Sequence, residues 1–126
     1  VGKGNNIYYK QTQNLKVITM IYDKWLKSWN EADVAAYKTL HHDDWEFKFH
    51  STGNIMRTGD MSDEQLEGMM KNHINENMRC IYENNDILVV HSVATFPSGD
   101  KEAVLMVHQK KDGLLWRTET GATPIK

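Results

Sequence analysis

The segment 14–30, NLKVITMIYDKWLKSWN, is apolar around most of its circumference when it is drawn as an α-helix. One side of this helix is an apolar stripe, which Val17, Met20 and Ile21 widen, so that few polar residues are left to face solvent. A helix of this kind is buried. We therefore expect the rest of the chain to wrap around it, with its two tryptophans against the inner face of a sheet. The stripe itself follows helical spacing and consists of Leu15, Ile18, Tyr22, Trp25, Leu26 and Trp29.

Composition narrows the class of protein. The 126 residues suffice for one domain that buries about two-thirds of its unfolded surface. Hydrophobic residues make up 40% and charged residues 25%, as in ordinary globular proteins. The net charge of −2 comes from interspersed charges, so no basic face predicts a nucleic-acid partner. Cys80 is the only cysteine, which excludes an intramolecular disulfide and a cysteine-based zinc site.

Residues 1–12 are expected to form a loose N-terminal leader, and residues 13–126 a single domain. No apolar run approaches the length of a membrane span, so no membrane partner is expected. The first residues, VGKGNNIYYK, are too polar for a signal peptide. The absence of both signals favours a cytoplasmic location.

The remaining elements follow from local patterns. Asp33 is a natural N-cap for a second helix over 34–40, and Ser62 with Gln65 forms a capping box that opens a third helix. The buried stripe of that third helix would contain Leu66, Met69, Met70 and His73. A strand over 45–50 and further strands after Asn77, with tight turns at Ser98-Gly99 and Asp112-Gly113, complete the chain. This order predicts an α+β domain: three helices from the N-terminal half on the concave face of a strongly bent, cone-shaped antiparallel sheet.

The run WLKSWNEADVAAYKTLHHDDWEFKF resembles the helix–helix–strand signature of the nuclear transport factor 2-like superfamily, in its polyketide-cyclase-like and ketosteroid-isomerase-like branch. The segment VATFPSGDKEAVLMVHQKKDGLLWRTETG looks like the closing strands of that fold. The resemblance covers roughly residues 13–121. It implies a cone whose interior holds a small, mainly apolar ligand. The residues that would line this pocket are Tyr22, Trp25, Trp29, Trp45, Phe47, Phe49, Met69, Met70, Leu105 and Trp116.

The steroid-isomerase mechanism does not carry over residue by residue. The resemblance places the general base of that family at Phe49 and its oxyanion tyrosine at Trp25. The second oxyanion acid would fall near Val107 or His108. Phe49 cannot take a proton from carbon, so the known isomerase chemistry is not expected.

Consecutive histidines and aspartates at positions 41–44 invite a metal interpretation. Adjacent side chains on a helix end or a strand point in different directions, so this run cannot supply convergent ligands. We interpret it as the solvated turn that ends the second helix, and we expect no metal and no cofactor.

The closing hairpins bring a polar cluster together. With two-residue loops at both turns, His91 faces Met106, Val89 faces His108, and His108 faces Arg117. One sheet face then carries Val89, His91, Val93, Val104, Met106, His108, Arg117 and Glu119. The other face is more apolar and includes Leu105 and Trp116, so we expect that face to line the pocket and the polar face to form a two-fold dimer.

The expected function is therefore the binding of a small apolar molecule by a homodimeric domain without an assignable catalytic apparatus. A cofactor-free isomerase, cyclase or dehydratase is the alternative if the polar face looks inward. The catalytic candidates are then His91, His108 and Glu119. An association module that oligomerises a partner is a further alternative.

Overall fold

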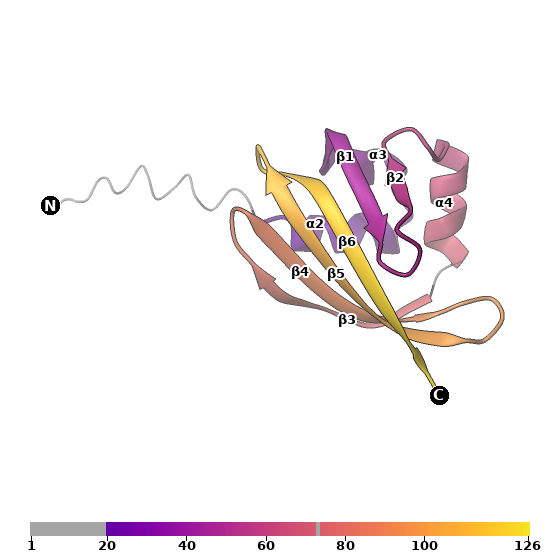
Figure 1. The fold of residues 1–126 in the computed structure, drawn as a ribbon. Helices are drawn as coiled ribbons and strands as arrows, with labels where there is room; N and C mark the ends of the chain where they lie inside the picture. Colours follow the sequence, from indigo (N-terminus) through magenta and orange to yellow (C-terminus); the bar gives the residue numbers. More distant parts are fainter. Residues whose placement is uncertain (1–19, 73) are drawn as a thin grey trace, which may run out of the picture.

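The structure, a computed structural model, describes residues 20–72 and 74–126. The predicted leader, the first residues of the predicted helix 14–30, and His73 lie outside the described residues. The elements follow in the order α2 (Tyr22–Asn30), α3 (Val34–Thr39), β1 (His41–Phe49), β2 (Ile55–Arg57), α4 (Asp63–Asn72), β3 (Ile74–Glu83), β4 (Ile87–Thr95), β5 (Lys101–Lys111) and β6 (Leu114–Ile125) (Figure 1).

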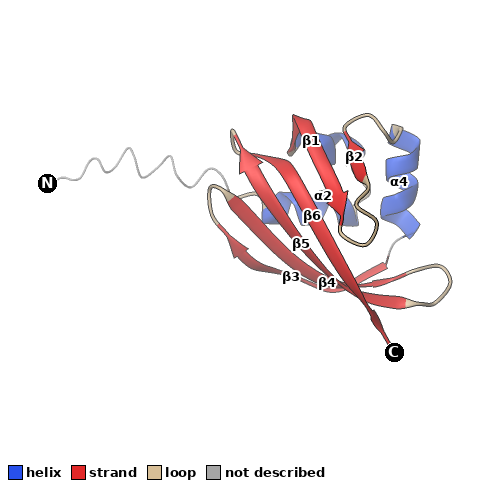
Figure 2. Ribbon diagram, viewed as in Figure 1, coloured by secondary structure: helices blue, strands red, loops and turns tan. Residues whose placement is uncertain are grey.

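The strands form one six-stranded curved sheet in the order β2-β1-β6-β5-β4-β3. The helices lie on its concave side, so the predicted α+β architecture is confirmed (Figure 2). The sheet is mixed rather than wholly antiparallel, because β1 and β6 pair in parallel. These strands are connected through α4 and four other strands, and a connection of that length permits a parallel pair.

Helix α2 packs its apolar side against the inner face of the sheet, as the sequence predicts. Trp25 is only 2% exposed, and Ile21 is also buried. The first turn is held by a distant carboxylate: Glu83 at the end of β3 accepts hydrogen bonds from the backbone N–H of Ile21 (2.7 Å) and of Tyr22 (3.2 Å). A negative charge at a helix N-terminus is favourable because it meets the positive end of the helix dipole.

The two predicted caps are confirmed. The Asp33 carboxylate accepts from the backbone N–H of Ala36 at 3.1 Å and begins α3. At α4, the Ser62 hydroxyl accepts from the backbone N–H of Gln65 (3.1 Å), and the Gln65 side chain accepts from that of Ser62 (2.8 Å). Local side-chain chemistry therefore fixes where both helices begin.

The turn between β4 and β5 has one residue more than the sequence interpretation assumed. Phe96 donates its backbone N–H to Asp100 at 2.9 Å, which leaves a three-residue loop ending in Gly99 with φ +92°. A loop of this length with glycine in the left-handed region is the next most common hairpin turn after the two-residue types. Consequently His91 faces Leu105 and Leu88 faces His108, one residue away from the predicted pairing.

The turn between β5 and β6 is the predicted two-residue loop, with Lys111 facing Leu114. Beyond it, the register shifts by one residue between the pair formed by Lys110 and Leu115 and the pair formed by Gln109 and Arg117. A β-bulge of this kind adds one residue to a strand and turns the following side chains to the opposite face. His108 therefore faces Thr118 instead of the predicted Arg117.

These two one-residue shifts change which side chains look inward. Val104, Met106 and His108, predicted for the dimer face, line the concave side instead. Leu105, predicted for the pocket, is 44% exposed on the convex side. Trp116 is likewise outside the cavity, with the Arg117 guanidinium 4.1 Å from its ring centre. Because side chains alternate along a strand, a single residue of register decides each of these placements.

Candidate functional site

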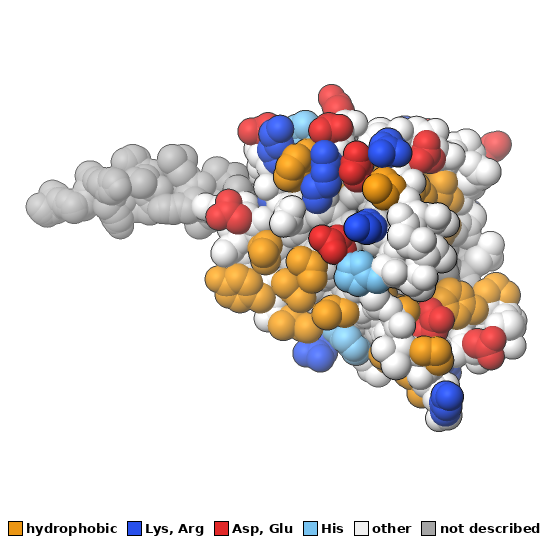
Figure 3. Space-filling model, viewed as in Figure 1, with side chains coloured by type: hydrophobic (Ala, Val, Ile, Leu, Met, Phe, Trp, Pro, Cys, Tyr) orange, Lys and Arg blue, Asp and Glu red, His pale blue; other side chains and the backbone are white. Residues whose placement is uncertain are grey.

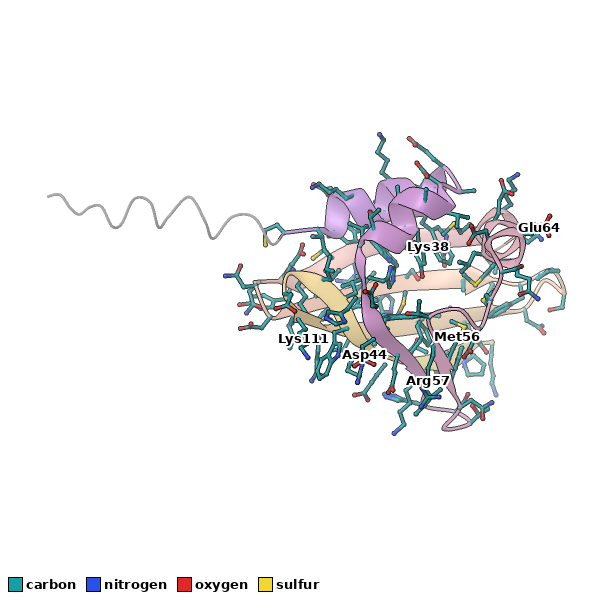
Figure 4. The ribbon with its side chains drawn as sticks, turned by 90° about the horizontal axis from the view of Figure 1, so that it is seen from above. Lys38, Asp44, Met56, Arg57, Glu64 and Lys111 are labelled. Atoms are coloured by element: carbon teal, nitrogen blue, oxygen red, sulfur yellow. The ribbon has the colours of Figure 1, made fainter. Side chains whose placement is uncertain are left out.

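A cavity of about 260 Å³ lies between the helices and the concave face of the sheet. Neighbours on the short strand β2 illustrate how its wall is built: Met56 lines the cavity, whereas Arg57 lies 3.4 Å from Glu46 on the other side of the sheet (Figure 4). The cavity runs from a deep end, where Trp25 and His108 are each 2% exposed, to a mouth where Phe49 is 37% exposed.

A continuous band of rings forms one wall of the cavity. Trp25 stacks on Trp29 with 6.1 Å between ring centroids, and Phe47 lies 4.8 Å from Phe49 near the mouth. The centroids of neighbouring rings in the band lie 4.4–6.1 Å apart, close to the separations of favourable aromatic contacts. The band passes from α2 through α3 to β1 and consists of Trp25, Trp29, Tyr37, His41, Trp45, Phe47 and Phe49.

Most of the predicted pocket residues surround this cavity. The structure places Trp25, Trp29, Trp45, Phe47, Phe49 and Met69 in its lining. Met70 is instead buried in the core, and Tyr22 packs against that core without lining the cavity. Leu105 and Trp116 are excluded by the register, as described above.

The predicted catalytic candidates are separated by the sheet. His108 lines the cavity, while His91 is on the opposite face of its strand. Glu119 is also on the convex side, where its carboxylate accepts from His50 at 2.8 Å. The two histidines therefore do not share the sheet face predicted for them. In residues 20–72 and 74–126, no group of three histidine, cysteine, aspartate or glutamate side chains could hold a metal ion.

His108 is fixed by a short polar chain at the deep end of the cavity. Its Nδ1 lies 2.7 Å from the Thr118 hydroxyl, which also accepts the indole N–H of Trp45 at 3.1 Å. Burial, with smaller contributions from the nearby His41 and Lys110, lowers the pKa of His108 to about 3. The imidazole is therefore neutral at physiological pH.

His41 is a second cavity histidine that the sequence interpretation placed in a solvated turn. Strand β1 already begins at this residue, and its Nδ1 donates to the Tyr37 carbonyl at 2.7 Å. Burial lowers the pKa of His41 to about 4, and the hydrogen bond to Tyr37 opposes this only in part. Since Nδ1 carries the proton, Nε2 is the atom that can accept a hydrogen bond.

Three buried polar atoms in the cavity lining have no hydrogen-bond partner among the described residues: Trp25 Nε1, Ser92 Oγ and His108 Nε2. Leaving such an atom unpaired costs roughly 1–3 kcal/mol. Trp25 Nε1 can only donate a hydrogen bond, so only a hydrogen-bond acceptor can pair with it. Sequence reasoning missed Ser92 because the predicted register put Ser92 among apolar wall residues without singling it out.

The two buried histidines predict a loss of stability in acid. Their folded pKa values lie below the ordinary 6.5, so the unfolded chain takes up protons first as the pH falls through that value. The contribution of the two neutral histidines to the free energy of unfolding is fully present above about pH 7. Below that pH it declines by about 1.4 kcal/mol per pH unit for each histidine. Urea denaturation at about pH 7.5 and about pH 5.5 should therefore differ by on the order of 3 kcal/mol.

The matched variants for this measurement are His108→Gln and His91→Gln. The first removes a buried titrating group and should roughly halve the pH dependence. The second replaces a histidine of the convex face and controls for the substitution itself. If the free energy of unfolding of His108→Gln depended on pH as strongly as that of the wild type, the neutral buried state of this histidine would be contradicted.

Many solved structures share this fold at low sequence identity. A candidate ketosteroid isomerase from Kribbella flavida gives a TM-score of 0.63 at 11% identity, covering 88% of this chain and 82% of that chain. A SnoaL-like protein of unknown function from Burkholderia thailandensis gives 0.59 at 12% identity, covering 94% and 96%. IdmH, a candidate polyketide cyclase from Streptomyces antibioticus, gives 0.56 at 14% identity, covering 79% and 87%.

The chain has the nuclear transport factor 2-like fold, in agreement with the resemblance seen in the sequence. Likeness at these identities shows the fold alone, because this fold carries unrelated activities. No protein-family model matches the sequence, and no curated protein matches it either. None of the helices in the described part of the chain is long and apolar enough to cross a membrane.

Proposed function

We propose that this chain binds a small, mainly apolar molecule in the cavity between α2 and the sheet. The observation that carries the proposal is the lining itself: a band of rings together with Met56, Met69, Met78 and Met106. Ligand pockets combine such apolar walls with a few polar groups that orient the ligand. The unpaired atoms of Trp25, Ser92 and His108 would supply further polar contacts inside the cavity.

A neutral aromatic probe tests this function, and naphthylmethanol is a suitable one. Ala94, which is 6% exposed, lines the cavity, so Ala94→Leu should fill part of it and weaken binding on the order of ten-fold, or about 1.4 kcal/mol. Isothermal titration calorimetry measures the affinity. The matched control is Ala103→Leu, one position away in register on the convex face.

The control variant should bind the probe as the wild type does. If neither the wild type nor Ala103→Leu binds the probe, or if Ala94→Leu leaves its affinity unchanged, the cavity is not the binding site. A thermal-shift measurement on each variant establishes that it is folded.

A cofactor-free isomerase, cyclase or dehydratase is the second candidate, because His41 and His108 line the same cavity. General acid–base catalysis is most efficient when the pKa of the group lies near the working pH. The pKa values of about 4 and about 3 leave both imidazoles unprotonated at neutral pH and weak as bases. This favours binding over catalysis for the unliganded site.

We also propose that the chain forms a homodimer through the convex face of the sheet. Figure 3 shows hydrophobic side chains gathered over β3–β5 on that face. Ile81 is 47%, Tyr82 56% and Leu105 44% exposed, and Val89 and Val93 lie beside them. Patches of this kind on a protein surface mark sites that something covers.

Leu105→Lys should convert the dimer to a monomer, because it places a charge in the apolar patch, where it would lose water without a partner. Sedimentation velocity at micromolar concentration measures the change. Asn30→Lys adds the same charge at the exposed end of α2 and should leave the dimer intact. A wild-type monomer under these conditions would refute the proposed assembly.

A further inference from the structure

The cavity carries one negatively charged side chain, Glu102, among its described lining residues, and no Lys or Arg. The other polar side-chain groups of this lining are hydroxyls, one amide, three indole N–H groups and the two histidines. Both histidines are neutral at physiological pH, since burial lowers the pKa of each. The interior is therefore electrostatically negative.

The register of β5 puts this carboxylate inside. Glu102 faces Ala94 on β4 and Pro124 on β6, and Ala94 itself lines the cavity. Side chains two residues apart share a sheet face, and Val104 and Met106 follow Glu102 along the same wall. This end of the strand is remote from Trp25 and His108 and close to the mouth.

The Glu102 carboxylate forms no ion pair or hydrogen bond with any side chain or backbone group in 20–72 or 74–126. The preceding residue, Lys101, lies 3.7 Å from Glu76 instead. The Glu102 carboxylate is half-buried. It can therefore act on whatever enters the mouth without first breaking an internal contact.

We propose that Glu102 selects ligands by charge and fixes their direction in the cavity, an inference that rests on the proposed binding function. The ligand class is a ring compound with a hydrogen-bond-donating head, a hydroxyl or a protonated amine. That head meets Glu102 at the mouth, and the ring body extends along the aromatic band toward Trp25. Compounds whose head is a carboxylate are rejected, because two negative charges would meet in a partly desolvated site.

Three probes with one ring system and different heads test the proposal: naphthylmethylamine, naphthylmethanol and naphthoate. Isothermal titration calorimetry at neutral pH gives the ratio of amine to naphthoate affinity for the wild type and for Glu102→Gln. The ratio should fall on the order of ten-fold in Glu102→Gln, equivalent to about 1.4 kcal/mol. The cost of removing each probe's own charge from water is common to both proteins and cancels in this comparison.

The matched control is Glu64→Gln, which removes the same charge from the exposed first turn of α4 (Figure 4). It should leave the ratio unchanged, which separates a local contact from the effect of net charge. An amine-to-naphthoate ratio that is the same in wild type and Glu102→Gln overturns the charge selection while naphthylmethanol still binds. If naphthylmethanol fails to bind the wild type, the proposed binding function falls, and charge selection falls with it.

Discussion

Replacing Glu83 by Gln is expected to lower the free energy of unfolding by on the order of 3–5 kcal/mol. Glu83 and Lys110 form an ion pair of 2.7 Å in which the side chains are 5% and 0% exposed. The substitution preserves the size of the side chain and an oxygen for the first turn of α2, but it removes the charge that balances the Lys110 ammonium. A buried charge without its counterion is costly because the protein interior solvates it poorly.

Urea denaturation measures this effect, and two further variants sharpen it. The double variant Glu83→Gln/Lys110→Met should recover much of the loss, since replacing a buried ion pair as a whole is far less costly than removing one partner. Glu31→Gln breaks the exposed pair with Lys27 at 4.0 Å and should change stability by less than about 1 kcal/mol. An equal decrease in the free energy of unfolding for Glu83→Gln and Glu31→Gln would show that breaking the buried pair costs no more than breaking the exposed one.

Trp25→Ala should cost about 3–5 kcal/mol, as large truncations in a core do. The indole is 2% exposed and contacts Trp29 on one side and His108 on the other, with centroids 6.1 Å and 5.8 Å away. Its removal enlarges the cavity at its deep end, where the surrounding sheet cannot close the gap. Thermal and urea denaturation provide the measurement.

Trp116→Ala is the control for this prediction. That indole lies outside the cavity beneath Arg117, so its loss removes an exposed cation–π contact worth about 0.5–1 kcal/mol together with part of its apolar contact. A cost for Trp25→Ala below about 1 kcal/mol would mean that α2 contributes little to the core.

The helices and their beginnings could be predicted because their signals are local. Asp33 caps the turn that directly follows it, and Ser62 and Gln65 satisfy each other within three residues. The buried face of α2 is equally local, because helical spacing alone brings Trp25 and Trp29 together. The support of α2 by Glu83 was not predictable in this way, since the carboxylate comes from 62 residues further along the chain.

The faces of the closing strands depend on single residues in turns and bulges. The Ser98-Gly99 turn allows two- and three-residue loops, and the sequence does not distinguish them. No glycine in the sequence marks the position of the bulge near Trp116. Both shifts reverse the side-chain direction beyond them, which is why His108 was assigned to the convex face while Trp45 and Phe47, on a strand with clear alternation, were placed correctly in the cavity wall.

The parallel pairing of β1 with β6 also shapes how the chain can fold. β6 lies between β1 and β5, so the two parts of the sheet meet only after the last strand has been made (Figure 1). The hydrogen bond from Trp45 to Thr118 spans 73 residues, and contacts of such long range slow folding because the intervening loop must close first. During synthesis on the ribosome, the pair of β1 with β2 and the hairpin of β4 with β5 therefore stay separate, each with an unpaired edge. The aromatic wall remains open until β6 inserts between them.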